Sequence, residues 1–234
     1  VVRKLSEIEI NKIAINISDE ICSSFPEYNI NKTDLFNSLS KINMFLANFK
    51  DNSAAKYYYK DDSIYFKEDI DFENLNTPAL HECLHFIQSI KNKKGKLLRL
   101  GLYDLTKFRT TGLAINEAAV QLMASYATLS KTDTVKYYGM ELITDSPNYY
   151  PIECTLVKQM TYPLFHSTLY SNDIFKNTFI MKSDEKTYEQ IITNLDLIVE
   201  YEEALHKENL YLSYIEYNNK SSSIKVANSQ RAIE

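Results

Sequence analysis

The sequence predicts an α+β protein that is mainly helical and carries one small antiparallel sheet. Most of the chain places apolar residues at helical spacing, whereas residues 55–67 follow a strand-like period. A Thr-Pro pair at 77–78 then begins a helix with two histidines one turn apart. These three features make the helix after residue 77 the expected centre of the fold.

Two amphipathic helices are expected before residue 50. Residues 5–24 form the first, and residues 34–49 show the helical period more clearly, with Thr33 as N-cap. In residues 55–67, two runs that contain tyrosine and isoleucine flank the polar segment 60–63. This pattern predicts a β-hairpin with a polar turn, which supplies the antiparallel sheet.

A third helix is expected from 78 to 91, because Thr77 is a good N-cap and proline at the first helical position costs no hydrogen bond. The basic run 91–96 (KNKKGK) is interpreted as its solvated end, where cations meet the negative end of the helix dipole. Further helices are expected at 113–129, 153–160 and 186–217. The tail 218–234 is rich in Ser and Asn and is expected to be loose.

The length of 234 residues suits a single domain with an N-terminal lobe at about 1–95 and a helical C-terminal lobe at about 96–217. Hydrophobic residues make up 44% and charged residues 24%, which is ordinary for a chain with a packed core. The net charge of -5 argues against a nucleic-acid partner. No stretch reaches the ~18 apolar residues that a membrane-spanning helix needs. The oligomeric state stays open.

Two features of the sequence bear on the cellular location. No signal peptide is visible, and three widely spaced cysteines do not form a disulfide framework, which slightly favours the cytoplasm. Because the chain begins with valine, a trimmed export signal stays open.

The chemistry of the chain is concentrated in the HExxH pattern of His81, Glu82 and His85. Residues four apart on a helix share one face, so both imidazoles can hold one Zn²⁺. Glu82 lies beside the first ligand, where it can take a proton from a zinc-bound water whose pKa falls toward ~7. Cys83 lies two residues from each histidine and is expected to point away. The alternative is a helix with two surface or core-edge histidines and a solvated glutamate.

A catalytic zinc site needs a third protein ligand, and Glu117 is the expected one. Small and apolar residues flank it, so we expect it to face a core, where a buried carboxylate needs a counter-charge such as a metal. The alternative is an acid that is favoured near a helix N-terminus. His166 and His206 are the rival ligands. His206 lies among charged residues and is expected at the surface, whereas His166 is an alternative residue of the cleft.

The chain resembles the gluzincin branch of the zincin metallopeptidases in His81, Glu82, His85 and the pair Asn116-Glu117. The resemblance covers residues 78–121. It implies a zincin-like fold in which the two histidines and Glu117 ligate zinc, while Glu82 acts as general base.

Two features depart from the gluzincin pattern. The gap between His85 and Glu117 is longer than in thermolysin-like enzymes. Gln121 stands where such enzymes often carry an acid that supports a ligand histidine. An amide oxygen can still accept an imidazole N–H, though more weakly than a carboxylate.

Peptide hydrolysis also needs a group that stabilises the oxyanion, and Tyr150 is the candidate because the adjacent Pro151 would hold it toward the cleft. His166 is the second candidate for this role. The alternative is that one of 18 tyrosines falls there by accident. Glu153 is either an acid that supports the site or an ordinary surface residue.

The expected function is therefore zinc-dependent hydrolysis of a peptide or protein substrate, with Glu82 as general base. The hairpin at 55–67 would offer an edge strand to an extended peptide. Two other functions stay open: a non-catalytic domain on a zincin scaffold that binds a partner or regulates a pathway, and a zinc hydrolase that acts on a non-peptide amide.

Overall fold

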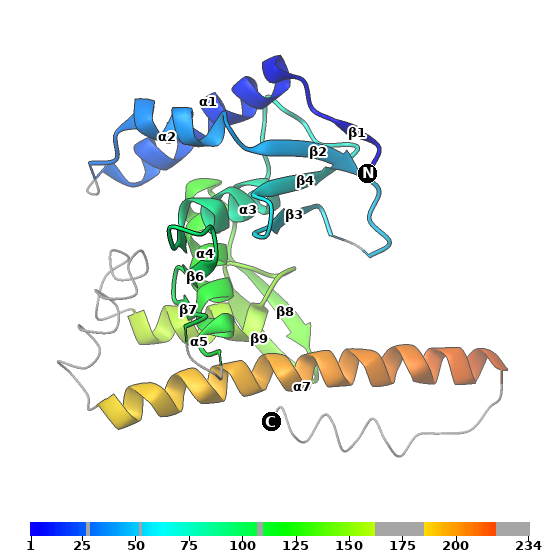
Figure 1. Ribbon diagram of the computed structural model, residues 1–234. Coiled ribbons are helices and arrows are strands. Elements are labelled where there is room, and N and C mark those ends of the chain that lie inside the picture. Colours follow the sequence, from blue (N-terminus) through cyan, green and yellow to red (C-terminus); the bar gives the residue numbers. More distant parts are fainter. Residues whose placement is uncertain (27–28, 52, 107–109, 162–184, 219–234) are drawn as a thin grey trace.

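The computed structural model describes residues 1–26, 29–51, 53–106, 110–161 and 185–218. Its helices are α1 (Glu7–Ser24), α2 (Lys32–Leu39), α3 (Thr77–Ile87), α4 (Leu113–Ala127), α5 (Pro151–Thr161) and α7 (Glu185–Asn218). Together with three small sheets, these helices form a mixed fold that fits the predicted α+β class. Helices α1 and α2 lie at one end of the molecule, α5 and α7 lie at the other, and α3 and α4 lie between them (Figure 1).

The three sheets are built from short strands. The strands are β1 (Arg3–Lys4), β2 (Asn43–Ala47), β3 (Ala55–Tyr58), β4 (Ser63–Lys67), β5 (Ser89–Lys91), β6 (Leu97–Leu100), β7 (Tyr103–Asp104), β8 (Asp133–Tyr137) and β9 (Met140–Thr144). The largest sheet has the order β1-β2-β4-β3, and β2 pairs with β4 in parallel. The predicted hairpin is confirmed as β3 and β4, but the expectation of one antiparallel sheet is wrong.

The predicted helix 34–49 is wrong in its second half. The helix α2 ends at Leu39, and β2 follows at Asn43–Ala47. In β2, the buried side chains of Met44 and Leu46 alternate with the exposed Asn43 and half-buried Phe45, so the period is two. The N-cap of α2 is Asn31 rather than Thr33, because the Asn31 side chain accepts hydrogen bonds from the first turn.

The helix α3 begins at its predicted place but ends earlier. Its N-cap is Asn76, whose side chain accepts from the N–H of Ala79, so Thr77 is the first helical residue rather than the cap. The helix stops at Ile87, and the basic run 91–96 joins β5 to β6 instead of ending the helix. This turn is fixed locally, because the Asn92 side chain accepts from two backbone N–H groups within it.

The helices predicted at 5–24, 113–129, 153–160 and 186–217 are confirmed as α1, α4, α5 and α7. At the start of α1, Ser6 and Glu9 form a reciprocal capping box. No helix in the described ranges is both long and apolar enough to span a bilayer.

Two hydrophobic clusters meet at α4. The first joins α4 to α1, α2, α3 and the four-stranded sheet, and the second joins α4 to α5 and α7. Val120 and Ala124 of α4 belong to the first cluster, whereas Ala114 and Ala118 belong to the second. A helix that is apolar on all sides is favoured only in such an interior. The helix α4 is therefore a rigid element for any side chain that it presents to α3.

Candidate metal centre

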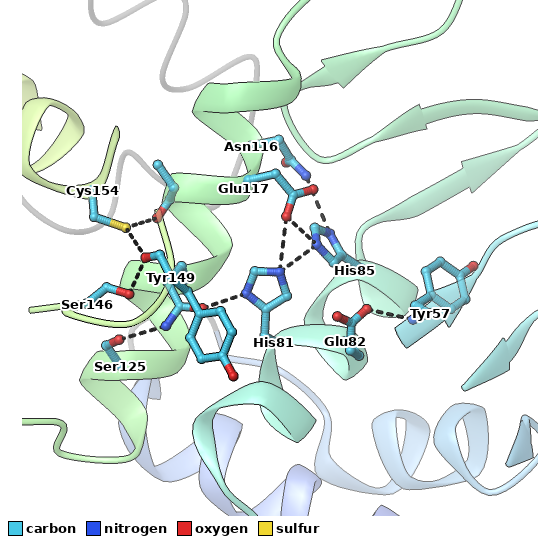
Figure 2. Close-up of polar contacts among 12 residues, drawn as sticks. Tyr57, His81, Glu82, His85, Asn116, Glu117, Ser125, Ser146, Tyr149 and Cys154 are labelled. Atoms are coloured by element: carbon cyan, nitrogen blue, oxygen red, sulfur yellow. Dashed lines mark hydrogen bonds and ion pairs between the residues drawn. The ribbon is translucent and has the colours of Figure 1, made fainter. Parts of the chain in front are cut away.

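Three side chains from two helices converge where α3 contacts α4. His81 and His85 of α3 point toward Glu117, which lies in the second turn of α4 (Figure 2). The Nε2 atoms of His81 and His85 lie 3.2 and 3.3 Å from Glu117 Oε2, and 2.9 Å from each other. All three ligand atoms lie within 4.8 Å of one another, so a single ion can contact them together.

The spacing of these atoms fits a tetrahedral zinc ion. Zinc–ligand bonds of about 2.0–2.1 Å at tetrahedral angles place neighbouring ligand atoms about 3.3 Å apart. The observed separations of 2.9, 3.2 and 3.3 Å are close to this value. Two imidazoles and one carboxylate are also a donor set that catalytic zinc uses, with one position left for water or substrate.

Side-chain amides lie on the outer sides of both imidazole rings. Gln121 Oε1 lies 2.9 Å from His81 Nδ1, so the amide oxygen accepts the imidazole N–H when Nε2 is the metal-facing atom. The Asn116 Nδ2 atom lies 3.5 Å from His85 Nδ1, while its Oδ1 accepts from the backbone N–H of Leu102 at 2.8 Å. Gln121 thus takes the supporting position that the sequence suggested for it.

The charge state of Glu117 is set by the two histidines. Burial by itself would raise the pKa of Glu117, but attraction to His85 and hydrogen bonds from both imidazoles outweigh burial and hold the pKa below its usual range. Glu117 is therefore an ionised carboxylate aimed at two imidazole nitrogens. An anionic oxygen is the form that binds a metal ion.

Glu82 lies beside the three converging side chains and is held by the edge strand. Its Oε2 accepts a hydrogen bond of 2.6 Å from the backbone N–H of Tyr57 in β3, which Figure 2 shows. Burial raises the pKa of Glu82 to about 7, although attraction to His81 and the Tyr57 hydrogen bond oppose the shift. A carboxylate with a pKa near neutrality is suited to both accepting and returning a proton.

A cavity of about 260 Å³ opens beside these groups. It is lined by Ser53, Ala54, Ala55, Lys56, Pro78, His81, Glu82, Glu117, Gln121, Tyr149 and Tyr150. Tyr150 has a left-handed backbone conformation with φ of 51°, a strained state that clusters at functional sites. Burial and the charges of Glu117 and Glu82 raise the pKa of Tyr150. Tyr150 therefore stays protonated as a hydrogen-bond donor.

The structure thus brings together all five residues that the sequence singled out: His81, Glu82, His85, Glu117 and Tyr150. His206 is exposed on α7, as expected, and Cys83 is buried in the first hydrophobic cluster, away from the ligands. His166 lies outside the described residues. Glu153 is fully buried rather than a surface residue.

Three contributors to the site were not predicted. Tyr57 acts through its backbone N–H, which no side-chain pattern can indicate. Tyr149 lines the cavity although only its neighbour was singled out. Asp196 of α7 accepts from the N–H groups of Gly112 and Ala114 at the start of α4, more than eighty residues earlier in the chain.

No protein-family model, curated protein or solved structure matches this chain. Its function is therefore inferred from the geometry of its own residues.

Proposed function

We propose that this chain is a zinc-dependent peptidase in which His81, His85 and Glu117 hold the ion and Glu82 is the general base. The observation that carries the proposal is the convergence of two imidazole nitrogens and one carboxylate oxygen within 4.8 Å, next to a cavity that Glu82 also lines. Bound there, zinc would supply a Lewis acid that acidifies a water and polarises a carbonyl.

Each carboxylate oxygen of Glu82 has a separate task in this proposal. Oε2 is fixed by the Tyr57 N–H, which leaves Oε1 to accept a proton from the attacking water and to return it to the leaving amine. A pKa of about 7 makes both transfers accessible near neutral pH. Tyr150 stays protonated and lines the same cavity, so its hydroxyl would donate to the oxygen that becomes negative during attack.

A peptide substrate is favoured over a small amide by the space around the site. A second cavity of about 430 Å³ shares Ala54, Pro78, Gln121 and Tyr149 with the first, so the two cavities adjoin. The strand β3 is also the edge strand of its sheet, and its Ala55 and Lys56 line the first cavity. An extended chain can therefore hydrogen-bond along β3 while its side chains enter the adjoining cavities.

The main rival is a non-catalytic domain that only binds a partner. Glu82 argues against it, because burying a carboxylate costs free energy and a binding domain gains nothing from that residue. The second rival is a hydrolase of non-peptide amides. A small amide substrate would not occupy both adjoining cavities.

The test compares Glu82→Gln with wild type in the digestion of a random peptide library. Because glutamine cannot accept the proton, cleavage should fall by about 10²–10⁴-fold, while zinc content stays equal to that of wild type. Glu203→Gln, which changes an exposed glutamate of α7, is the matched control and should cleave like wild type. Equal cleavage by Glu82→Gln and wild type would exclude Glu82 as the base.

A further inference from the structure

Two buried carboxyl groups come from the helices α5 and α7. Glu153 of α5 is 0% exposed and Glu202 of α7 is 9% exposed. Neither oxygen of Glu153, nor Oε1 of Glu202, has a hydrogen-bond donor within the part of the chain that is described. The two groups are coupled electrostatically, because the charge of Glu153 raises the pKa of Glu202, and α5 and α7 pack in the same hydrophobic cluster.

Among the described residues, the surroundings of this pair hold no compensating cation. Its titratable neighbours are Tyr137, Tyr138, Tyr150 and Cys154, all of which are neutral when protonated. No lysine or arginine of the described ranges forms an ion pair with Glu153 or Glu202. Two ionised carboxylates cannot share such a place, so the folded state must hold at least one proton between them.

The helix that this pair attaches also supports the candidate metal centre. Ile192 and Leu195 of α7 pack into the second hydrophobic cluster. Between them and Glu202, the Asp196 carboxylate accepts from the N–H groups of Gly112 and Ala114 at 2.8 and 3.0 Å. The N-cap of α4 is a glycine without a side chain, so Asp196 replaces the missing cap. Glu117 follows in the next turn of the same helix.

We propose that Glu153 and Glu202 form a proton-dependent latch that docks α7 on α5, so that docking of α7 and its Asp196 cap on α4 weaken as the pH rises. The proposal does not depend on the peptidase function.

The direction of the pH effect follows from the difference in proton binding between the folded and the unfolded state. Burial raises the pKa of Glu153, and burial together with the Glu153 charge raises the pKa of Glu202 to about 8. An unfolded glutamate has a pKa of about 4.3, so the folded state binds the extra proton between about pH 4 and pH 8. The stabilisation is complete below that range, declines as the pH rises through it, and is lost above about pH 8.

The test measures the unfolding equilibrium and the hydrogen-exchange protection of α7. The proteins compared are wild type, Glu202→Gln and the control Glu203→Gln, all with a chelator present. The folded wild-type protein binds one proton more than the unfolded chain. Between pH 6 and pH 8, the unfolding equilibrium constant of wild type should therefore rise by up to about tenfold more per pH unit than that of Glu202→Gln. Hydrogen exchange of residues 191–205, corrected for intrinsic rates, should lose protection over this range in wild type and Glu203→Gln only. Histidine titration is common to all three proteins and cancels in the comparison.

A parallel pH dependence of wild type and Glu202→Gln would overturn the latch, as would equal loss of α7 protection in both. If Glu202→Gln does not fold, Glu153→Gln gives the same comparison from the other side of the pair. Failure of both variants to fold at pH 5, where the wild-type pair is protonated, would likewise contradict the proposal, because a neutral amide should replace a neutral carboxyl there.

Discussion

In the candidate metal centre, the imidazole of His81 is oriented by a neighbouring amide. Gln121 accepts from His81, and Asn116 lies between His85 and the backbone of Leu102. Gln121 is itself held, because its Nε2 donates to Ser125 Oγ at 3.3 Å. Groups in this position fix the tautomer and the direction of a ligand histidine.

Replacing Gln121 should therefore weaken metal binding without removing a ligand. We expect Gln121→Ala to lower zinc affinity by about 10–100-fold, as measured by competition with a fluorescent chelator. Gln121→Glu, with a stronger acceptor for the imidazole N–H, should bind zinc at least as tightly as wild type. Gln190→Ala, at an exposed position of α7, is the control. Unchanged affinity in Gln121→Ala would mean that His81 is oriented by its packing alone.

The residues of the site differ in how far the sequence could predict them. His81, Glu82 and His85 are linked by helical geometry, so their spacing alone brings them together. Glu117 and Tyr150 depend on how α4 and α5 pack on α3, so the sequence could offer them only as candidates. The contact of the Tyr57 backbone with Glu82 has no sequence signal, because any residue supplies the same N–H group.

At the level of elements, helices with caps and long apolar stripes were predicted well, and short strands were not. Residues 43–49 contain apolar residues at positions that suit both a helix and an alternating strand. Parallel pairing with β4 stabilises this segment as the strand β2, and the local sequence does not indicate that pairing. The strands β8 and β9 were missed for the same reason, since they stabilise each other only as a pair.

The turn between β6 and β7 is a sensitive element because it contacts α4 beside the candidate ligand Glu117. Gly101 has a φ of 56°, and a Cβ there would lie 2.2 Å from Asn116 Oδ1 and 2.5 Å from Gln88 Oε1. We expect Gly101→Ala to cost roughly 1–2 kcal/mol for the left-handed backbone and about 1–3 kcal/mol more for the overlap. Chemical denaturation measures the total.

Gly95→Ala is the matched control for this prediction. Gly95 has a φ of 77° in the turn between β5 and β6, but a Cβ there meets no atom within 4 Å. The Gly95→Ala control should therefore lose only the stability that the left-handed backbone costs. Equal destabilisation by the two substitutions would show that Asn116 and Gln88 move away at no cost.

For the molecule as a whole, α4 joins the two hydrophobic clusters and carries Glu117, Asn116 and Gln121 toward α3. Its ends are held by separate parts of the chain. Asp196 of α7 caps its start, and Thr77 of α3 contacts Thr128 just after its end through their hydroxyls at 2.7 Å. The position of the proposed third ligand, Glu117, is thus a property of the complete fold rather than of a local motif.

The zinc content of the purified protein, determined by elemental analysis, tests the metal centre most directly. Wild type should hold one zinc per chain, Glu117→Ala should lose most of it during dialysis, and His166→Ala should keep it. Retention of zinc by Glu117→Ala together with its loss from His166→Ala would contradict the assignment of Glu117 as the third ligand, and a zinc-free wild type would contradict the metal centre itself.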